Sequence, residues 1–296
     1  MKCDTKASEQ KSLIAALFIT SGIMILEVIG GLISNSLALL SDAWHMLSDL
    51  TALLLCFMAG KIALKPPTKD KTYGYYRVEV LSALVNGIML VLIAIFISYE
   101  AFNRFIHEVK VKSLEMLIIA VIGLIANLLS ISFLSKHSLN LNIKAAFLHV
   151  LGDAISSIGV IIGALTIFFT GWHFIDPIIG LIISAIIIYG TGKMLYTILH
   201  ILLEGTPKHI DINELKESIK NIDGIIDVHD IHVWSITSYI HCLSAHLTVK
   251  PWAIKDLNAM LNKVKQILES KYGITHSTLQ FEEEGYKEIG EIHNFQ

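Results

Sequence analysis

The sequence predicts an α-helical polytopic membrane protein with six transmembrane helices, followed by a C-terminal cytoplasmic α+β domain. The composition indicates the membrane part, because 53% of the residues are hydrophobic and only 17% are charged. Six apolar stretches also reach the roughly 20 residues that a helix needs to cross a hydrocarbon core of about 30 Å. A change to charged, periodic sequence after residue 202 predicts the second domain. Together these observations argue against a soluble globular protein.

The apolar stretches define an expected membrane domain at residues 13–201, preceded by a cytoplasmic N-terminal tail at residues 1–12. The first stretch is too long for the apolar part of a cleavable signal peptide, and no small-residue cleavage pattern follows it. It therefore predicts a membrane helix. The six expected spans are residues 13–34, 37–63, 81–102, 114–134, 145–170 and 177–198.

Lysine and arginine residues predict the orientation of these spans, because short cytoplasmic loops carry an excess of positive charge. The opposite side holds only Arg104, Lys110 and Lys112. Both termini and the C-terminal domain are therefore expected in the cytoplasm. The residues of the positive side are Lys2, Lys6, Lys11, Lys65, Lys69, Lys71, Arg77, Lys136 and Lys144.

A linker at residues 202–210 leads to the C-terminal domain, which we place at residues 211–296. Its first segment predicts an amphipathic helix, because isoleucine and leucine recur at intervals of three and four residues. Two segments rich in β-branched and aromatic residues predict strands. The order of elements predicts helices packed on one sheet. The expected elements are a helix at residues 211–222, strands at 225–236 and 239–249, a helix at 254–272 and a strand at 277–283.

One pattern, His-x-Leu-x-Asp, occurs in both the second and the fifth span, as His45 with Asp49 and as His149 with Asp153. Residues four apart share one face of a helix, so each copy offers an imidazole and a carboxylate side by side. Two nitrogens and two oxygens suit tetrahedral Zn²⁺, and also Cd²⁺ or Co²⁺. Hydrogen bonding between helices is the structural alternative. Placing an Asp at the centre of a membrane helix costs about 2.5 to 3.5 kcal/mol. Because the pattern places two such residues in the membrane, an ion site explains it better than hydrogen bonding between helices does.

The chemistry of these ligands couples the binding of metal to the release of protons. Zinc binds neutral imidazoles and ionised carboxylates, so binding releases protons and weakens as the pH falls. Two further polar residues of the spans are expected to support the ligands through hydrogen bonds. These are Asp42, one turn before His45, and Asn127 in the fourth span.

Two other classes of function fit the sequence less well. A catalytic zinc usually keeps three protein ligands and an open position for water, whereas four ligands are expected here, so we do not expect an enzyme. A membrane-anchored metal sensor or a passive divalent-cation channel is the main alternative, and only an antiporter would need a proton gradient. Nucleic acid is not an expected partner, because 23 basic residues nearly balance 26 acidic ones.

The chain resembles the cation diffusion facilitator family, the proton-coupled zinc-efflux transporters. The resemblance implies six membrane helices, a cytoplasmic ferredoxin-like domain and a homodimer that exports Zn²⁺ from the cytoplasm in exchange for protons, conferring metal resistance. It also implies that His45, Asp49, His149 and Asp153 form the transport site. The compact length predicts a bacterial plasma membrane protein. The motifs that carry the resemblance are Ser-Leu-Ala-Leu-Leu-Ser-Asp-Ala-Trp-His at residues 36–45 with Asp49, Tyr-Gly-Tyr-Tyr-Arg-Val-Glu at 73–79, His149 with Asp153, Leu-Glu-Gly-Thr-Pro at 203–207 and Val-His-Asp-Ile-His-Val-Trp at 228–234.

The resemblance also implies a regulatory zinc site in the cytoplasmic domain, at His229, His246, His276 and Glu282. Alternation in a regular strand would place His232 on the opposite face from His229, so those two could not easily share a metal. Some members of the family bind a metal through histidines between the second and third spans. Residues 65–77 contain no histidine, so we expect no metal there.

Overall fold

The computed structural model describes residues 2–135 and 141–286 and divides the chain into two compact units. The first unit comprises Met1–Phe57 and Ser82–Met194, and the second comprises Met58–Leu81 and Leu195–Gln296. Each unit is described by itself below.

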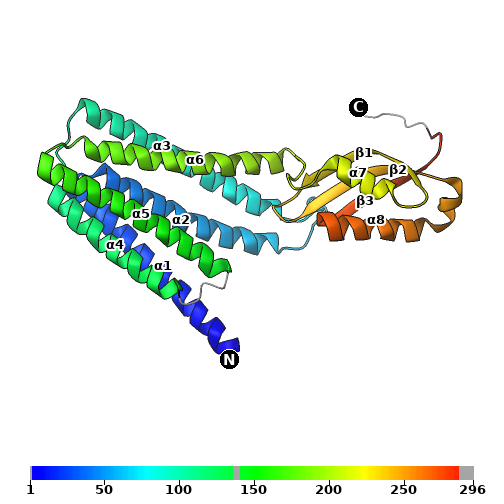
Figure 1. The fold of residues 1–296 in the computed structure, drawn as a ribbon, viewed down its shortest axis with the longest axis horizontal. Helices are drawn as coiled ribbons and strands as arrows, with labels where there is room; N and C mark the ends of the chain where they lie inside the picture. The colour runs from blue at the N-terminus through cyan, green and yellow to red at the C-terminus, as the bar shows by residue number, and fades with distance from the viewer. Residues whose placement is uncertain (1, 136–140, 287–296) are drawn as a thin grey trace. The chain divides into compact units, whose positions relative to one another are not determined.

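Six helices of the described residues are long and apolar enough to cross a membrane, which confirms the predicted number (Figure 1). Most extend a few residues beyond the predicted spans, because polar residues at the ends of a membrane helix continue its backbone without adding hydropathy. The expected N-terminal tail from residue 2 onwards is part of the first helix. The helices are α1 (Lys2–Ser34), α2 (Leu37–Ala63), α3 (Arg77–Ile106), α4 (Ser113–Ser135), α5 (Leu141–Thr170) and α6 (Ile175–Leu202).

Small residues let the helices of the first unit approach closely. Figure 1 shows α1, α4 and α5 side by side, with α3 next to α6. A Cβ atom on Gly30 of α1 would collide with the side chain of Ile119 on α4, so this contact requires glycine. The outward faces carry exposed apolar side chains such as Phe18, Leu54 and Phe102, as expected of surfaces that contact lipid.

The start of α2 is held by a buried carboxylate from another helix. Asp176, in the first turn of α6, is 0% exposed and accepts hydrogen bonds from Ser36 Oγ at 2.6 Å and from the backbone N–H groups of Leu37 and Ala38 at 2.7 and 3.1 Å. Arg104 Nη1 of α3 lies 3.5 Å from the same carboxylate. Asp176 thus supplies an acceptor for the free N–H groups of α2 and a negative charge at its positive end.

The second unit contains the predicted α+β domain, and the predicted order of its elements is confirmed. The strands form one sheet in the order β1-β2-β3, in which β1 and β2 are antiparallel and β2 and β3 are parallel. The described elements are α7 (Ile212–Lys220), β1 (Ile225–Ser235), β2 (His241–Val249), a 3₁₀-helix (Pro251–Asp256), α8 (Leu257–Tyr272) and β3 (Ile274–Glu283).

Local sequence explains where the two helices of this domain begin and end. Asp211 caps α7, because its carboxylate accepts hydrogen bonds from the backbone N–H groups of Asn213 and Glu214 at 2.8 and 3.2 Å. Gly273 ends α8 in a left-handed conformation, with φ of +67°, and its N–H donates to the carbonyl of Glu269.

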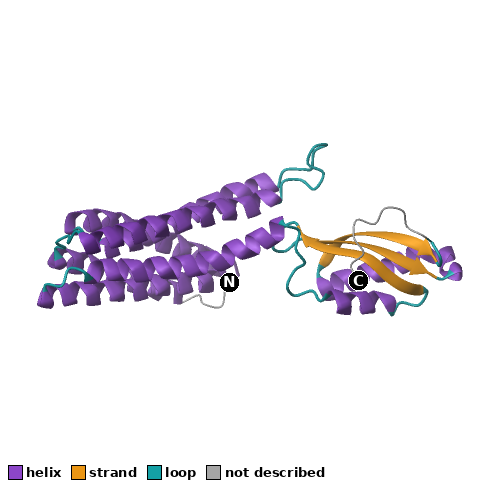
Figure 2. Ribbon diagram, turned by 90° about the horizontal axis from the view of Figure 1, so that it is seen from above, coloured by secondary structure: helices purple, strands orange, loops and turns teal. Residues whose placement is uncertain are grey.

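Both helices pack on one face of the sheet, which leaves the other face for polar side chains (Figure 2). Ile219 of α7 and Val264 of α8 belong to a single buried core. They share it with Leu243 and Leu247 of β2. The residues of β2 alternate between buried and half-buried from Leu243 onwards. His246 therefore lies on the face opposite the helices.

Asp227 of β1 makes the stability of this domain depend on pH. Burial acts to raise the pKa of this carboxyl, but hydrogen bonds from Lys220 Nζ and the Val228 N–H and the charges of Lys216 and Lys220 outweigh it, so the pKa lies below 3.8. Because the folded-state pKa is lowered, the stabilisation is present above the unfolded-state pKa, near 3.8, and is lost as the pH falls through the folded-state value.

We therefore expect Asp227→Asn to lower the free energy of local unfolding at pH 7 by about 0.2 to 1 kcal/mol, since the carboxylate is partly exposed and screened. Hydrogen exchange of the β1 and β2 amides in the full-length protein measures this change. The difference from the native protein should shrink below about pH 4. The exposed Asp223 provides a control, because Asp223→Asn should change the exchange rates less. An effect of Asp227→Asn that persists fully at about pH 2 would contradict this explanation.

Candidate metal sites

The first copy of the duplicated pattern lies on α2, where His45 and Asp49 face each other across one helical turn. His45 Nε2 lies 3.7 Å from Asp49 Oδ2, as expected of residues four apart on a helix. The two side chains are 35% and 29% exposed. Both side chains are therefore only partly buried, although Asp49 Oδ2 itself is covered.

The second copy lies on α5. Asp153 is buried, at 4% exposure, and its backbone carbonyl accepts a hydrogen bond from Ser157 Oγ at 3.0 Å. His149 also belongs to α5, but its side chain lies outside the part of the chain that the structure describes. Within the described side chains of the membrane helices, no three metal-ligating groups come within 4.8 Å of one another.

The two residues expected to support the ligands both contact α5 near Asp153. Asp42 Oδ1 accepts a hydrogen bond from Ser156 Oγ at 2.8 Å, and Asn127 Nδ2 of α4 donates to Ser157 Oγ at 3.5 Å. Both Asp42 and Asn127 are nearly fully buried. They therefore connect α2 and α4 to the turn of α5 that follows Asp153.

Glu27 of α1 also belongs to this region, although no sequence motif marks it. It is 1% exposed and lies close enough to Asp42 and Asp153 to interact with them electrostatically. A Cβ atom on Gly123 of α4 would lie 3.0 Å from Glu27 Oε1 and 3.9 Å from Ser157 Oγ, so this glycine provides the space for the carboxylate. A lone glutamate carries no repeated pattern, and only its position on the inward stripe of α1 could have indicated its burial.

The electrostatics of this region favour cations. Three carboxylates, those of Glu27, Asp42 and Asp153, are buried here. Such groups need a proton, a metal ion or a cationic partner, because an isolated ionised carboxylate is costly in a low-dielectric interior. The neighbouring segments of α1, α2, α4 and α5 contain no lysine or arginine, so the region is suited to protons and metal ions. These segments are residues 17–60, 114–135 and 145–170.

A second group of candidate ligands lies on the face of the C-terminal sheet opposite α7 and α8, where Glu282 is buried. One ligand atom from each of His229 on β1, His246 on β2 and Glu282 on β3 lies within 4.8 Å of the others. Glu282 joins the two histidines, since its Oε2 is 3.1 Å from His229 Nε2 and its Oε1 is 3.0 Å from His246 Nδ1. His229 and His246 are directly paired in the β1–β2 register. The sheet therefore brings together three of the four residues predicted for a cytoplasmic site.

The structure does not bring His276 into this group. His276 pairs with Cys242, four residues along β2 from His246, and its exposed ring packs edge-on against Tyr73 with the ring centres 5.6 Å apart. A residue advances about 3.3 Å along a strand, so His276 lies too far away to share a metal with His246.

The expectation that His232 lies on the opposite face of the sheet from His229 is wrong, because β1 is not a regular strand. The pairs His229↔His246 and His232↔Ser244 have two residues of β1 between them but only one residue of β2. This extra residue is a β-bulge, which shifts the alternation of β1 by one position. His232 and His229 therefore point to the same face of the sheet.

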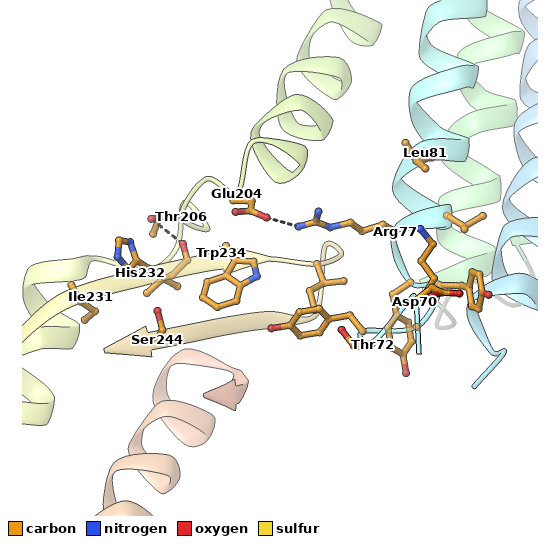
Figure 3. A pocket seen from close by; sticks show the side chains of 18 of the residues that line it. Asp70, Thr72, Arg77, Leu81, Glu204, Thr206, Ile231, His232, Trp234 and Ser244 are labelled. Carbon is orange, nitrogen blue, oxygen red and sulfur yellow. Dashed lines mark hydrogen bonds and ion pairs between the residues drawn. The ribbon is translucent and has the colours of Figure 1, made fainter. Parts of the chain in front are cut away.

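A cavity of about 830 Å³ lies elsewhere in the second unit (Figure 3). The segment before α3, the junction after α6 and strands β1 and β2 line it. Arg77 Nη2 donates to Glu204 Oε1 at 3.1 Å on one side of this cavity, as Figure 3 shows. Tyr239 Oη donates to Glu79 Oε2 at 2.5 Å. These contacts connect the start of α3 to the junction after α6 and to the turn between β1 and β2.

Two family models match the chain, one for a cation efflux transmembrane domain at residues 13–203 and one for the cytoplasmic domain of cation efflux proteins at residues 207–284. The chain is 40% identical over 285 residues to a "Cadmium, cobalt and zinc/H(+)-K(+) antiporter" of Bacillus subtilis, covering 95% of this chain and 91% of that protein. It is 41% identical over 280 residues to the metal cation efflux system protein CzcD of Cupriavidus metallidurans, covering 94% and 88%. It is 41% identical over 275 residues to the zinc transporter ZitB of Escherichia coli, covering 92% and 87%.

Proposed function

Because the chain belongs to the cation efflux family and is an integral membrane transporter of metal cations rather than an enzyme, we propose that it exports Zn²⁺ from the cytoplasm in exchange for protons. The proposed transport site consists of His45, Asp49, His149 and Asp153. The single observation that carries this proposal is the duplicated histidine and aspartate pair on α2 and α5, next to a buried group of carboxylates. Cd²⁺ and Co²⁺ suit the same donors, and both are in the name of the Bacillus subtilis relative.

Metal and protons compete for these ligands in the proposed cycle. A near-neutral cytoplasm favours neutral imidazoles and ionised carboxylates, which bind Zn²⁺. Exposure to a more acidic exterior protonates the same groups and releases the ion. Moving two positive charges outward against an inside-negative potential of about 100 mV costs about 4.6 kcal/mol, and one returning proton offsets about 2.3 kcal/mol. Protons therefore reduce the electrical cost as well as displacing the metal.

Asp42 and Asn127 act on the ligands indirectly in this proposal. Each contacts a serine of α5, Ser156 or Ser157, in the turn that follows Asp153. Hydrogen bonds of this kind hold ligand-bearing segments in place, and their loss typically lowers metal affinity by about 10- to 100-fold. The two residues are thus expected to position Asp153 relative to α2.

Zinc flux into proteoliposomes, with and without an imposed pH gradient, tests the proposed antiport. A zinc-sensitive dye in the lumen reports uptake by the native protein. We expect an acidic lumen to accelerate uptake and collapse of the gradient by an ionophore to abolish this acceleration. Flux that ignores the pH gradient would instead identify a passive channel. No flux, with zinc still bound by the C-terminal domain, would identify a membrane-anchored sensor.

We further propose that His229, His246 and Glu282 bind a regulatory Zn²⁺. Two imidazoles and one carboxylate are suitable donors for zinc, and the spacing of their ligand atoms, within 4.8 Å, suits a common ion. Three protein ligands leave a fourth position of a tetrahedral site for water or another group. A homodimer in a bacterial plasma membrane, with both termini in the cytoplasm, is the assembly that we propose for the transporter.

His246→Ala tests the regulatory site. The variant is made in an Asp153→Ala background, so that the proposed transport site does not contribute. We expect the full-length protein in detergent to lose one tightly bound zinc per chain, measured as metal content after gel filtration. His276→Ala is the matched control on the neighbouring strand and should retain that zinc. An unchanged zinc content in His246→Ala would exclude this site.

A further inference from the structure

Asp230 is the residue that makes the β1 bulge, and its backbone is unusual. Its φ of +44° lies in the left-handed region, which residues other than glycine rarely adopt. The register shift between His229 and His232 places it beside the proposed regulatory zinc site. Bulges often redirect a side chain next to a functional site, and backbone strain concentrates at such sites. In a regular strand, residue 230 would point away from the face that His229 occupies.

The side chain of Asp230 joins two histidines of this face. Its Oδ1 lies 2.9 Å from His232 Nε2, and its Oδ2 lies 3.6 Å from His246 Nε2. The other nitrogen of His246, Nδ1, faces Glu282 Oε1 at 3.0 Å. The imidazole of His246 is therefore placed between two carboxylates, one on the proposed metal side and one on the bulge.

We propose that Asp230 is a positioning residue for the regulatory zinc, an inference that rests on the metal site proposed above. In this arrangement His246 would bind the ion through Nδ1, which leaves its Nε2 nitrogen facing the Asp230 carboxylate at 3.6 Å. A carboxylate that accepts from the second nitrogen of a metal-binding histidine fixes the tautomer and the orientation of the ring and makes the ligand more basic. His232 donates to the other oxygen of Asp230 and holds this carboxylate in place.

The identity of the bulge residue is consistent with this role. Aspartate and asparagine are the residues after glycine that best tolerate the left-handed region, because their short polar side chains form local hydrogen bonds. Glycine would relieve the backbone strain but would supply no carboxylate. The position therefore satisfies two requirements at once, a left-handed backbone and a negative charge directed at His246.

Asp230→Asn separates these two requirements, because asparagine keeps the backbone preference and the shape but lacks the negative charge. The experiment uses the full-length protein in detergent, in the Asp153→Ala background, with zinc affinity measured by competition with a chelating dye. We expect Asp230→Asn and Asp230→Gly to bind zinc about 10- to 100-fold more weakly. Asp223→Asn, at an exposed position of the same domain, should retain the affinity.

A second readout separates positioning from a structural role. Without metal, hydrogen exchange of the β1 and β2 amides should be nearly unchanged in Asp230→Asn. The added protection of these amides by zinc should require a higher zinc concentration than in the native protein. Native zinc affinity in Asp230→Asn, with affinity lost in His246→Ala, would overturn the role of Asp230 and leave the metal site intact. Strongly reduced protection without metal would also overturn it. Native zinc binding in His246→Ala would instead reject the metal site itself.

Discussion

Replacing Asp153 by alanine is expected to reduce zinc flux driven by a pH gradient to the level of liposomes without protein. Asp153 is one of the four proposed ligands, and it lies buried beside Asp42 and Glu27. Its loss removes both a zinc ligand and a proton acceptor, so metal binding and proton coupling should fail together. The same proteoliposome assay measures this loss, with equal amounts of native and variant protein reconstituted.

Two variants show whether the loss is specific to the site. Glu108→Gln removes an exposed carboxylate from the same unit and should leave the flux unchanged. Asn127→Ala removes a group that reaches α5 only through Ser157, so we expect a decrease of about 10-fold rather than a complete loss. Native flux in Asp153→Ala would contradict the proposed transport site, even if the protein is an antiporter.

Asp176→Ala is expected to have the largest effect on the stability of the membrane unit. The substitution removes the acceptor for Ser36 Oγ and for two backbone N–H groups of α2, and it leaves Arg104 without one of its carboxylate partners. Removing one member of a buried ion pair typically costs about 3 to 5 kcal/mol. Because Arg104 keeps Glu100 as a partner, we expect a loss near the lower end of this range. Thermal unfolding in detergent, together with hydrogen exchange at the start of α2, measures this loss.

The variants of this carboxylate should form a graded series. Asp176→Asn keeps an acceptor oxygen but loses the charge, so its loss of stability should be smaller than that of alanine. Glu100 is the other carboxylate partner of Arg104 and is partly exposed. Glu100→Gln should therefore lower the stability less than either substitution of Asp176. Equal stability of Asp176→Ala and the native protein would show that Asp176 does not hold the start of α2.

Periodic patterns predicted much of the fold from the sequence. Hydropathy marked six membrane helices, because a span of about 20 apolar residues is needed to cross the bilayer whatever its neighbours are. The four-residue spacing predicted that His45 lies beside Asp49, because the geometry of a helix depends only on residues close together in the sequence. Segments rich in β-branched and aromatic residues likewise predicted the strands that the structure shows as β1 and β2.

The sequence by itself thus determined the membrane spans, the order of the elements and the position of His45 beside Asp49, since each depends on residues close together along the chain. Only the tertiary structure decided which distant residues meet. It buried Glu27 against Gly123, and it separated His276 from His246 along the sheet. It also introduced the bulge at Asp230, which turned His232 to the face of His229. Strand register and helix packing set these contacts, and both depend on residues far apart in the sequence.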